Sequence, residues 1–549
     1  MEHDPTQWRR DVRLDAAIVA LVAAVSLAVH LGSLGFYSDD WDLLGSFALA
    51  PVQSLPGFYR TLYAQPQVRM RPGQVLYLSL LYRVFGAAPL GYHLVNAAVL
   101  VAAAVLLVLV LRDLGVPRVI AISAGVLYPV LPHYSTARVW YSAFQAPLSM
   151  AAYLFSLYAA LRSLHSAAWR TWAWRIASLA ALVASALAYE VALPLFFLNP
   201  LLVWVRQRRL ASQAAAPPSQ RGLLLFLAAT VAAALSVAGF KALTSTRLSH
   251  ASKPGYLASL IHQISHINAA VYGIAAPRTL WIALHNSAEP ASIALAAGLG
   301  ILVAGYLYRV LAREPLPSLR QSVQLAIAGA AVVLLGHVVF ITTRVSFSPT
   351  GPNNRTAVAA AAGVALGWSA AAALAAALLP RRWRAPTFAG VVGAGVCGAF
   401  LVTMSLEKFW VIAYEQERQL LAGIRQSFPT LPRETTLLLD GFCPYVGPAI
   451  VFEAPWDLKG ALWVVYQDST LRADVVSPNL RVEPDGIVTR IYGEDAKYPY
   501  RGLVVFNART QSTYQIADAA GARAYFADHN PDLSNGCPPG RPGHGVQVF

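Results

Sequence analysis

The stretch PLGYHLVNAAVLVAAAVLLVLVL, residues 89–111, contains no Asp, Glu, Lys or Arg. A helix needs about 20 predominantly apolar residues to cross a bilayer, and this stretch is long enough. The sequence predicts eleven such spans in all, and the other ten are residues 14–34, 119–135, 142–161, 176–190, 191–205, 223–243, 291–311, 323–341, 356–379 and 385–404. The pair across 176–205 is short, so it is either two half-helices or one kinked span. Residues 73–86 are expected to form a helix at the membrane interface.

The composition agrees with this reading. Among the 549 residues 56% are hydrophobic, only 13% are charged, and the mean hydropathy is +0.50. Soluble domains carry roughly 25% charged residues. The values exclude a soluble enzyme, a disordered chain and a disulfide scaffold, and they predict an α-helical polytopic membrane protein. The net charge of +15 therefore needs no nucleic-acid partner.

Clusters of arginine predict the orientation. Under the eleven-span count, all of these clusters fall on one side of the membrane, and the positive-inside rule makes that side the cytoplasm. We therefore expect an integral plasma (inner) membrane protein with a cytoplasmic N-terminus and residues 405–549 outside. The clusters are Arg9, Arg10 and Arg13; Arg112 and Arg118; Arg162, Arg170 and Arg175; Arg206, Arg208, Arg209 and Arg221; Arg309, Arg313 and Arg320; and Arg381, Arg382 and Arg384.

Acidic residues separate two regions of the chain. Sixteen of the 27 lie in residues 405–549, and only eleven lie in residues 1–404. The tail begins with a helical pattern and continues with the strand-like pieces TTLLL, ALWVVY, GIVTRIY and RGLVVF, which turn residues separate. We expect residues 1–404 to form the transmembrane body and residues 405–549 a small extracytoplasmic α+β domain. Cys443 and Cys537 either pair in an oxidising compartment or remain thiols.

Three of the eleven acids of the body occur together just after the first span, in FYSDDWD, residues 36–42. Asp39, Asp40 and Asp42 at a membrane surface suit a general base acting on a hydroxyl, or oxygen ligands for a divalent cation. The alternative is a solvated loop that caps a following helix. Because acids are scarce in this region, the sequence favours a functional site.

Glu190 is the only carboxylate inside a continuous apolar run, ALAYEVALPLFF. Acids within membranes are energetically costly and usually functional. The predicted topology places Glu190 near the outer end of its span, on the same side as Asp39. The alternative is a structural glutamate that snorkels or pairs with an arginine.

The outer side also carries cations that the orientation rule does not require. Arginine suits bidentate contacts with phosphate, so together these residues are candidates to bind a membrane-embedded phosphate, whereas singly each is an interface anchor. His93 either donates to the same phosphate or satisfies a neighbouring carbonyl. The cations are Arg69, Arg71, Arg138, Arg247, Arg344 and Arg355.

Motifs for other chemistries are missing from the sequence. It has no Walker loop, no GxGxxG between a strand and a helix, no HExxH and no CxxC. Nucleotide-driven and zinc chemistry are therefore disfavoured, and an activated substrate is expected to arrive through the membrane.

Several motifs, in this order and topology, resemble those of the GT-C superfamily of polytopic glycosyltransferases. Relatives in that superfamily include protein O-mannosyltransferases and the bacterial enzymes that add aminoarabinose to lipid A. The resemblance covers residues 14–380 and departs from the family at Tyr189, where lysine is usual. It rests on Asp39-Asp40 in FYSDDWDLL, on MRPGQVLYLSLLYRVFGAAPLGYHLVNAAVL at 70–100, on YEVALP at 189–194, and on Arg355 in NNRTAV.

The resemblance implies transfer of a sugar from a polyprenyl phosphate to an extracytoplasmic acceptor, with inversion. The acceptor is a glycan, a lipid or a protein. Asp39 would be the general base, with Asp40 as the alternative or as the group that orients it. Arg71 and Arg355 would stabilise the departing phosphate, and Glu190 would position an arginine, the phosphate-binding loop or the acceptor. No metal or other cofactor is expected, although a divalent cation at Asp39 and Asp40 is the weaker alternative.

Two other classes of function compete with this prediction. A transporter or lipid flippase predicts charges at the bilayer midplane and repeated halves, whereas the charges here gather at the outer surface. A non-catalytic envelope assembly protein predicts that Asp39 and Asp40 tolerate replacement. The catalytic hypothesis predicts that Asp39, Glu190, Arg71 and Arg355 line one outward-facing cavity.

Overall fold

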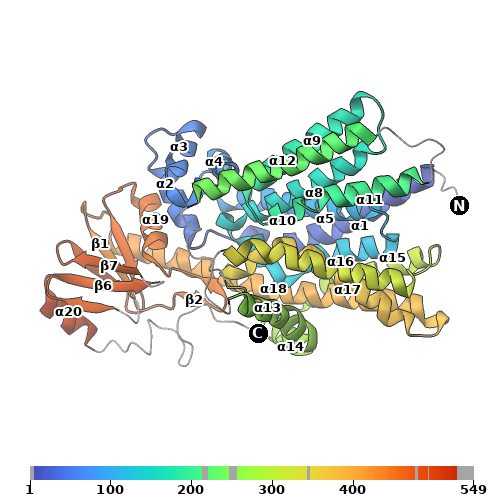
Figure 1. Cartoon of the computed structure of the whole chain (residues 1–549). Helices are drawn as coiled ribbons and strands as arrows, with labels where there is room; N and C mark the ends of the chain where they lie inside the picture. The colour runs from blue at the N-terminus through green and yellow to red at the C-terminus, as the bar shows by residue number, and fades with distance from the viewer. Residues whose placement is uncertain are drawn as a thin grey trace.

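A computed structural model describes residues 5–212, 220–245, 256–287, 289–342, 346–476, 480–491 and 494–527. Long helices form an elongated body, and a smaller part that contains all of the labelled strands lies at one end of it (Figure 1). The N-terminus lies at the opposite end of the body.

Nine helices in the described part of the chain are long and apolar enough to cross a membrane. A polytopic helical membrane protein is thereby confirmed, whereas the count of eleven spans is not. The nine are α1 (Pro5–Ala28), α5 (Pro89–Asp113), α8 (Gln145–Ser163), α9 (Trp169–Ala188), α12 (Gln220–Thr244), α15 (Pro290–Leu311), α16 (Leu319–Val338), α17 (Val358–Ala377) and α18 (Arg381–Ser427).

The two remaining predicted spans are shorter helices. Residues 119–135 form α6 (Arg118–Leu127) and the 3-10 turns η3 (Tyr128–Val130) and η4 (Pro132–Tyr134), because proline lacks the N–H that would continue an α-helix. Every residue of α6 is buried by the surrounding protein. The helix therefore presents no side chain to lipid and need not match the thickness of the bilayer. Residues 191–205 form α10 (Leu193–Phe196) and part of α11 (Asn199–Ala211), so the pair across 176–205 is two separate helical segments.

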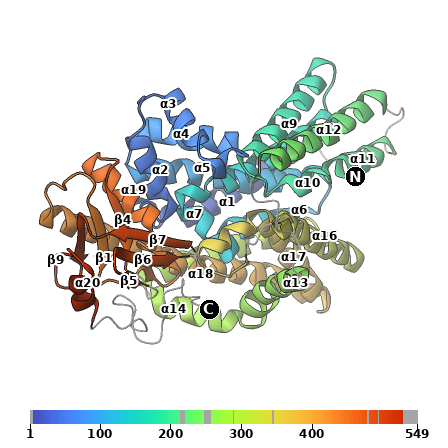
Figure 2. The same ribbon diagram turned by 60° about the vertical axis from the view of Figure 1, so that its left-hand side comes forward.

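Shorter helices complete the body, and those of residues 39–85 lie at its end nearest the strands (Figures 1 and 2). The expected helix at 73–86 is observed as α4 (Pro72–Phe85). The others are η1 (Leu31–Ser33), α2 (Asp39–Ala48), α3 (Leu55–Tyr63), η2 (Pro66–Val68), α7 (Thr136–Val139), η5 (Tyr141–Ala143), α13 (Tyr256–Ser265), the π-helix η7 (His266–Ile274), α14 (Ala276–Ser287), η8 (Val339–Thr342) and η9 (Pro352–Ala357).

Ion pairs join several helix ends at the far end of the body. Arg118 at the start of α6 lies 2.9 Å from Asp15 and 2.8 Å from Asp11, both on α1. It also lies 3.3 Å from Glu314, just after α15, while Arg112 at the end of α5 lies 3.4 Å from Asp15. We call these five residues the inner cluster. The inner cluster joins helix segments that the predicted eleven-span topology places on one side of the membrane. That this side is the cytoplasm stays a prediction.

Helix α18 continues without a break from the body into the C-terminal region. Its 47 residues correspond to roughly 70 Å at 1.5 Å per residue. The boundary expected at residue 405 therefore lies inside a helix, and the helical pattern expected at the start of the tail is the second half of α18.

The C-terminal region contains a four-stranded sheet in the order β4-β1-β8-β9, in which β1 is parallel to β4 and β8. A hairpin, β2-β3, and a three-stranded antiparallel sheet, β5-β6-β7, complete the strands. The helices are α19 (Pro455–Tyr466) and α20 (Ala519–Phe526). The strands are β1 (Thr436–Asp440), β2 (Tyr445–Val446), β3 (Ala449–Ile450), β4 (Arg472–Val475), β5 (Arg481–Glu483), β6 (Gly486–Ile491), β7 (Glu494–Pro499), β8 (Leu503–Asn507) and β9 (Ser512–Gln515).

Three of the four strand-like pieces are strands, namely β1, β6 and β8, but the prediction for ALWVVY was wrong. These residues form the end of α19, which has Pro455 in its first turn and the carboxylate of Asp457 accepting from the N–H groups of Glu453 and Ala454. Such N-terminal signals outweigh the β propensity of a short run of valines. Cys537 lies outside the described residues, so its pairing with Cys443 stays a prediction.

Candidate active site

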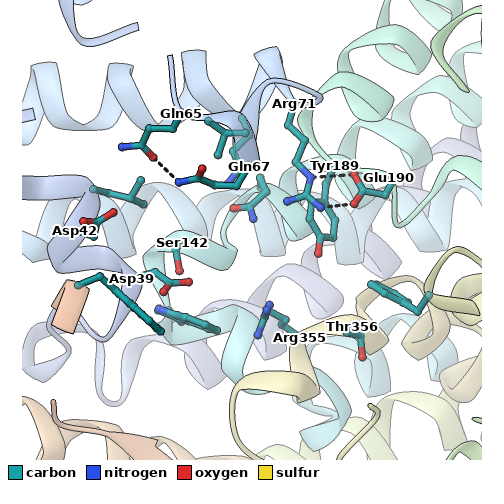
Figure 3. Close-up of a pocket in the computed structure, with 17 residues that line it drawn as sticks. Asp39, Asp42, Gln65, Gln67, Arg71, Ser142, Tyr189, Glu190, Arg355 and Thr356 are labelled. Atoms are coloured by element: carbon teal, nitrogen blue, oxygen red, sulfur yellow. Dashed lines mark hydrogen bonds and ion pairs between the residues drawn. The ribbon is translucent and has the colours of Figure 1, made fainter. Parts of the chain in front are cut away.

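A cavity of about 400 Å³ opens where the short helices, the long helices and the C-terminal region meet (Figure 3). The polar and charged residues on its wall come from segments far apart in the sequence. Asp39, Arg71, Glu190 and Arg355, which the sequence predicted to share one cavity, all line it. The full wall is Asp39, Asp42, Leu43, Gln65, Gln67, Val68, Arg71, Gln74, Trp140, Ser142, Gln145, Tyr189, Glu190, Phe340, Arg355, Thr356 and Trp456.

The acidic side of the cavity is the first turn of α2. The helix begins at Asp39, and Asp40 and Asp42 follow in the same turn. Carboxylates are favourable there because the N-terminal end of a helix dipole is positive. Ser38, immediately before the helix, has a φ of +48°, which is uncommon for a residue other than glycine. Figure 3 shows Asp39 and Asp42 beside the cavity, with Ser142 close to Asp39.

Asp40 does not line the cavity and is fully buried. Its Oδ2 accepts hydrogen bonds from the backbone N–H groups of Tyr37 at 2.9 Å and Tyr141 at 3.3 Å, and its Oδ1 accepts one from Ser142 at 2.7 Å. This carboxylate holds the segment before α2 against the segment that follows α7. The structure therefore gives Asp40 an anchoring position and leaves Asp39 and Asp42 on the wall.

Asp42 pairs with the C-terminal region. Its Oδ1 lies 3.7 Å from Nζ of Lys459 on α19. Burial raises the pKa of the Asp42 carboxyl, and the charge of Lys459 opposes that shift. Asp42 is thus an acid at the edge of the site that is already engaged by a cation.

The basic side of the cavity is built around Glu190, which lies in the break between α9 and α10. Its Oε2 accepts a hydrogen bond from Nε of Arg71 at 3.0 Å, and Nη2 of Arg71 contacts Oε1. Nζ of Lys241 lies 3.2 Å from Oε2 and also donates to the carbonyl of Met70 at 3.0 Å. The guanidinium of Arg71 lies 4.4 Å from the ring centre of Tyr189, within range of a cation–π contact.

These charges keep Glu190 ionised. Burial alone would raise its pKa, but the neighbouring Arg71 and Lys241 outweigh burial and lower the pKa to about 2. Two cations and one anion leave the group with a net positive charge. The Arg-paired reading of Glu190 is thus what the structure shows, and the pair itself faces the cavity.

Lys241 was missed as a site residue in the sequence analysis. It lies near the end of an apolar span, in AGFKALT, and it is one of only five lysines in the chain. A lone intramembrane lysine is itself a functional signal. What the sequence could not supply is the packing of α12 against α9, which brings Lys241 to Glu190.

Arg355 lies on the wall in η9. Its Nη1 donates to the carbonyl of Pro352 at 2.6 Å, and its guanidinium lies 4.7 Å from the ring centre of Trp140. In the part of the chain that the structure describes, Arg355 has no carboxylate partner. Figure 3 shows its side chain between the acidic side and the Arg71–Glu190 pair. It is a cation held over an aromatic ring and available to an anion.

Two other predicted phosphate ligands lie elsewhere. Arg138 is buried, with its guanidinium 2.7 Å from Glu407 and donating to the carbonyls of Pro129 and Ser26, each at 2.7 Å. Nε2 of His93 lies 2.9 Å from the carbonyl oxygen of Gly35, which is the alternative left open for that residue. Neither lines the cavity. Arg344 lies outside the described residues.

The C-terminal region forms part of the site through Trp456 and through the contact between α19 and α2. At Gly460 an added Cβ would lie 2.3 Å from the carbonyl oxygen of Trp41, and at Gly45 it would lie 2.8 Å from that of Gly460. Only glycine allows the two helices to approach so closely. The hydroxyl of Ser38 also donates to Glu453 at 3.5 Å. The segment that carries Asp39 is therefore packed directly on the C-terminal region.

The described residues contain no group of three or more His, Cys, Asp or Glu side chains placed to hold a metal ion. The backbone N–H groups already occupy the Asp40 carboxylate, which the weaker alternative would have used as a ligand. Of the three aspartates in the first turn of α2, Asp39 and Asp42 line the cavity.

Searches for similar proteins gave matches among solved structures only; no family model and no curated protein matches the chain. One match is ArnT from Cupriavidus metallidurans bound to undecaprenyl phosphate, with 17% identity, 86% of each chain covered and a TM-score of 0.37. Its apo state gives 18% identity, 84% and 85% coverage, and a TM-score of 0.36.

Another match is an oligosaccharyltransferase from Archaeoglobus fulgidus, tethered with an acceptor peptide, with 15% identity. The alignment covers 78% of this chain and 62% of that one, with a TM-score of 0.35. These proteins belong to the group of glycosyltransferases that the sequence motifs resemble. Because a TM-score below 0.5 does not establish a common fold, the assignment of function rests on the cavity itself.

Proposed function

We propose that the protein is a membrane glycosyltransferase. It moves a sugar from a polyprenyl phosphate to the hydroxyl of an acceptor on the outer side of the membrane. The observation that carries the proposal is the single cavity lined by Asp39, Arg71, Glu190 and Arg355. The sequence hypothesis required these four residues to share one cavity, and their common wall supports the proposal.

In the proposed reaction Asp39 accepts the proton of the acceptor hydroxyl. The acceptor oxygen forms a bond to the anomeric carbon of the sugar while the bond between that carbon and the phosphate oxygen breaks. The attack comes from the face opposite the phosphate, so the configuration inverts. The electron pair of the broken bond stays on the polyprenyl phosphate, and a general base of this kind contributes typically 10²–10⁴-fold to the rate.

Negative charge grows on the phosphate as it departs, and cations fixed beside it stabilise the transition state. Arg355 is placed for this role because it has no carboxylate partner in the described part of the chain. Arg71 and Lys241 share one carboxylate, so their group keeps a net positive charge toward the cavity. Glu190 acts as a positioning residue that fixes Arg71. No step requires a metal ion.

The donor would enter from the membrane, because the cavity lies beside the end of α9 and the start of α17, and Lys241 near the end of α12 contacts Glu190 on its wall. We infer that this end faces away from the cytoplasm, because the arginine clusters gather at the other end. The acceptor would then be an extracytoplasmic glycan, lipid or protein, with the C-terminal region beside the point of transfer.

The test uses the full-length protein in nanodiscs, radiolabelled polyprenyl phosphates carrying different sugars, and an envelope fraction as acceptor. We expect transfer by the wild type and a loss of about 10²–10⁴-fold in Asp39→Asn. Glu415→Gln, an exposed acid on the outer part of α18, serves as the matched control. Undiminished transfer by a folded Asp39→Asn protein would refute the role of Asp39, and no transfer from any donor by the wild type would refute the proposed activity.

A further inference from the structure

Two buried glutamines line the cavity with unused hydrogen-bonding groups. Gln74 on α4 is 5% exposed and Gln145 at the start of α8 is 4% exposed. The side-chain oxygen of each is buried without a hydrogen-bond partner, and neither amide bonds to any other described residue. Buried polar groups are nearly always paired, so each of these amides has bonding capacity left for a molecule in the cavity.

The other two glutamines of the wall are already engaged. Nε2 of Gln67 donates to Oε1 of Gln65 at 3.0 Å, and Nε2 of Gln65 donates to Ser46 at 3.3 Å. Gln74 and Gln145 therefore differ from their neighbours, because neither of their amides has a hydrogen-bond partner among the described residues. A primary amide offers two N–H donors and a carbonyl acceptor, which matches a hydroxyl group that donates and accepts at once.

Most charged groups of the wall either form ion pairs or have a role in the proposed reaction. Of its three carboxylates, Glu190 pairs with Arg71 and Lys241, Asp42 pairs with Lys459, and Asp39 is the proposed base. Both cations of the wall, Arg355 and the Arg71 that shares Glu190 with Lys241, are assigned to the phosphate in the proposed reaction. No carboxylate and no cation of the described wall is thus left over for a charged group on the sugar.

Aromatic rings complete the wall at Trp140, Tyr189 and Trp456. Large rings supply apolar contact area, and the C–H faces of a sugar ring are the apolar part of an otherwise hydroxylated molecule. Amides together with aromatic rings therefore fit a neutral carbohydrate better than they fit a peptide side chain or an ion.

From this arrangement we infer that Gln74 and Gln145 bind hydroxyl groups of the transferred sugar, and that this sugar is neutral rather than amino or acidic. The inference rests on the proposed glycosyl transfer and names the substrate class of the same cavity. Both glutamines determine specificity; neither exchanges a proton in the reaction.

The experiment compares wild type with Gln74→Met and Gln145→Met, which keep an unbranched side chain and remove the amide. Exposed Gln419 on α18, changed to Met, is the control. Two ligands are titrated in nanodiscs: a polyprenyl phosphate bearing a neutral hexose, and the same polyprenyl phosphate without sugar. Each cavity variant is expected to weaken binding of the sugar-bearing ligand about 3- to 10-fold, which is the range for one uncharged hydrogen bond. Binding of the bare lipid phosphate is expected to change less than 2-fold.

Equal weakening of both ligands, or of neither, would overturn the role of the two glutamines. A wild type that transfers only an amino sugar or a uronic acid would overturn the neutral class. Both results leave the proposed transferase intact, because the wild type still transfers sugar in them. A wild type that transfers no sugar from any donor overturns the proposed function itself, and this inference falls with it.

Discussion

The two ends of the helical body differ in how their arginines are paired. At the inner cluster, Arg118 contacts Asp11, Asp15 and Glu314, and its guanidinium is nearly buried. At the cavity, Arg355 has no carboxylate partner in the described part of the chain, and the amides of two buried glutamines make no hydrogen bond to described residues. Groups that are fully paired hold helices together, whereas groups with unused bonding capacity are available to a ligand.

Exchanging one arginine at each end tests this contrast most strongly. Arg355→Met is expected to lower the transfer rate about 100-fold or more, since it removes a group that stabilises developing charge, with little effect on thermal stability. Arg118→Met is expected to destabilise the protein by about 3–5 kcal/mol, because it leaves buried carboxylates unpaired, while the rate per folded molecule stays near wild type.

Transfer assays and thermal unfolding in detergent measure the two effects side by side. A rate loss in Arg118→Met as large as in Arg355→Met, in protein that remains folded, would erase the distinction between the two ends.

Glu190 belongs to the cavity and yet is paired like a residue of the inner cluster. Its pKa is about 2 in the folded protein, against an ordinary value of about 4.5, which corresponds to about 3 kcal/mol of stabilisation. Because the folded-state pKa is lowered, this contribution is present above pH 4.5 and is lost as the pH falls toward 2.

We therefore expect Glu190→Gln to lower stability by about 3 kcal/mol at pH 7, and by less near pH 3, where the wild type has lost much of the contribution. Unfolding midpoints of the variant and the wild type across pH 3–8 measure the effect. A difference between the two proteins that is the same at every pH would argue against the ion pair as its cause.

The contact between α2 and α19 links the cavity to the outer region. Gly460→Ala places a methyl group against the carbonyl of Trp41, and forced packing of this kind costs about 1–3 kcal/mol. We expect a matching loss of stability and a several-fold lower transfer rate, because Asp39 on α2 and Trp456 on α19 move together. Gly390→Ala, where an added Cβ meets nothing within 4 Å, is the control, and wild-type behaviour of Gly460→Ala would show that the contact is not required.

The smallest expected effect is that of metal removal. Transfer is expected to continue at the wild-type rate after dialysis against EDTA, because Asp39 acts as a base and arginines carry the phosphate charge in the proposed reaction. A rate that falls in EDTA and returns with Mg²⁺ or Mn²⁺ would instead assign Asp39 and Asp42 to a cation.

Much of this architecture follows from hydropathy alone. Apolar length identifies the nine long helices, and Pro72 marks the start of α4. The apolar runs at 119–135 and 191–205 were predicted to be spans but form shorter helices. Apolar content alone does not distinguish a lipid-facing span from a short helix that other helices enclose. For ALWVVY, the signals at Pro455 and Asp457 lie upstream of the run that was interpreted as a strand.

Part of the site could be predicted from the sequence because charged residues are rare in the membrane body. Acids and arginines are rare enough near the outer surface that Asp39, Arg71, Glu190 and Arg355 could be selected from the sequence, and they do share a cavity. Asp40, His93 and Arg138 have the same residue types, and only tertiary contacts show that their polar atoms are turned to backbone groups or to Glu407. Gln74, Gln145 and Trp456 are common residue types with no distinguishing pattern.

The continuity of helix α18 limits which insertions and deletions this part of the chain can tolerate. A flexible linker between two domains absorbs an added or deleted residue without moving either domain. In a continuous helix, one extra residue turns everything beyond it by about 100° and shifts it by 1.5 Å. Between the membrane and residue 427, a single-codon insertion would therefore rotate α19 away from α2, whereas substitutions on the exposed face of the same segment would not.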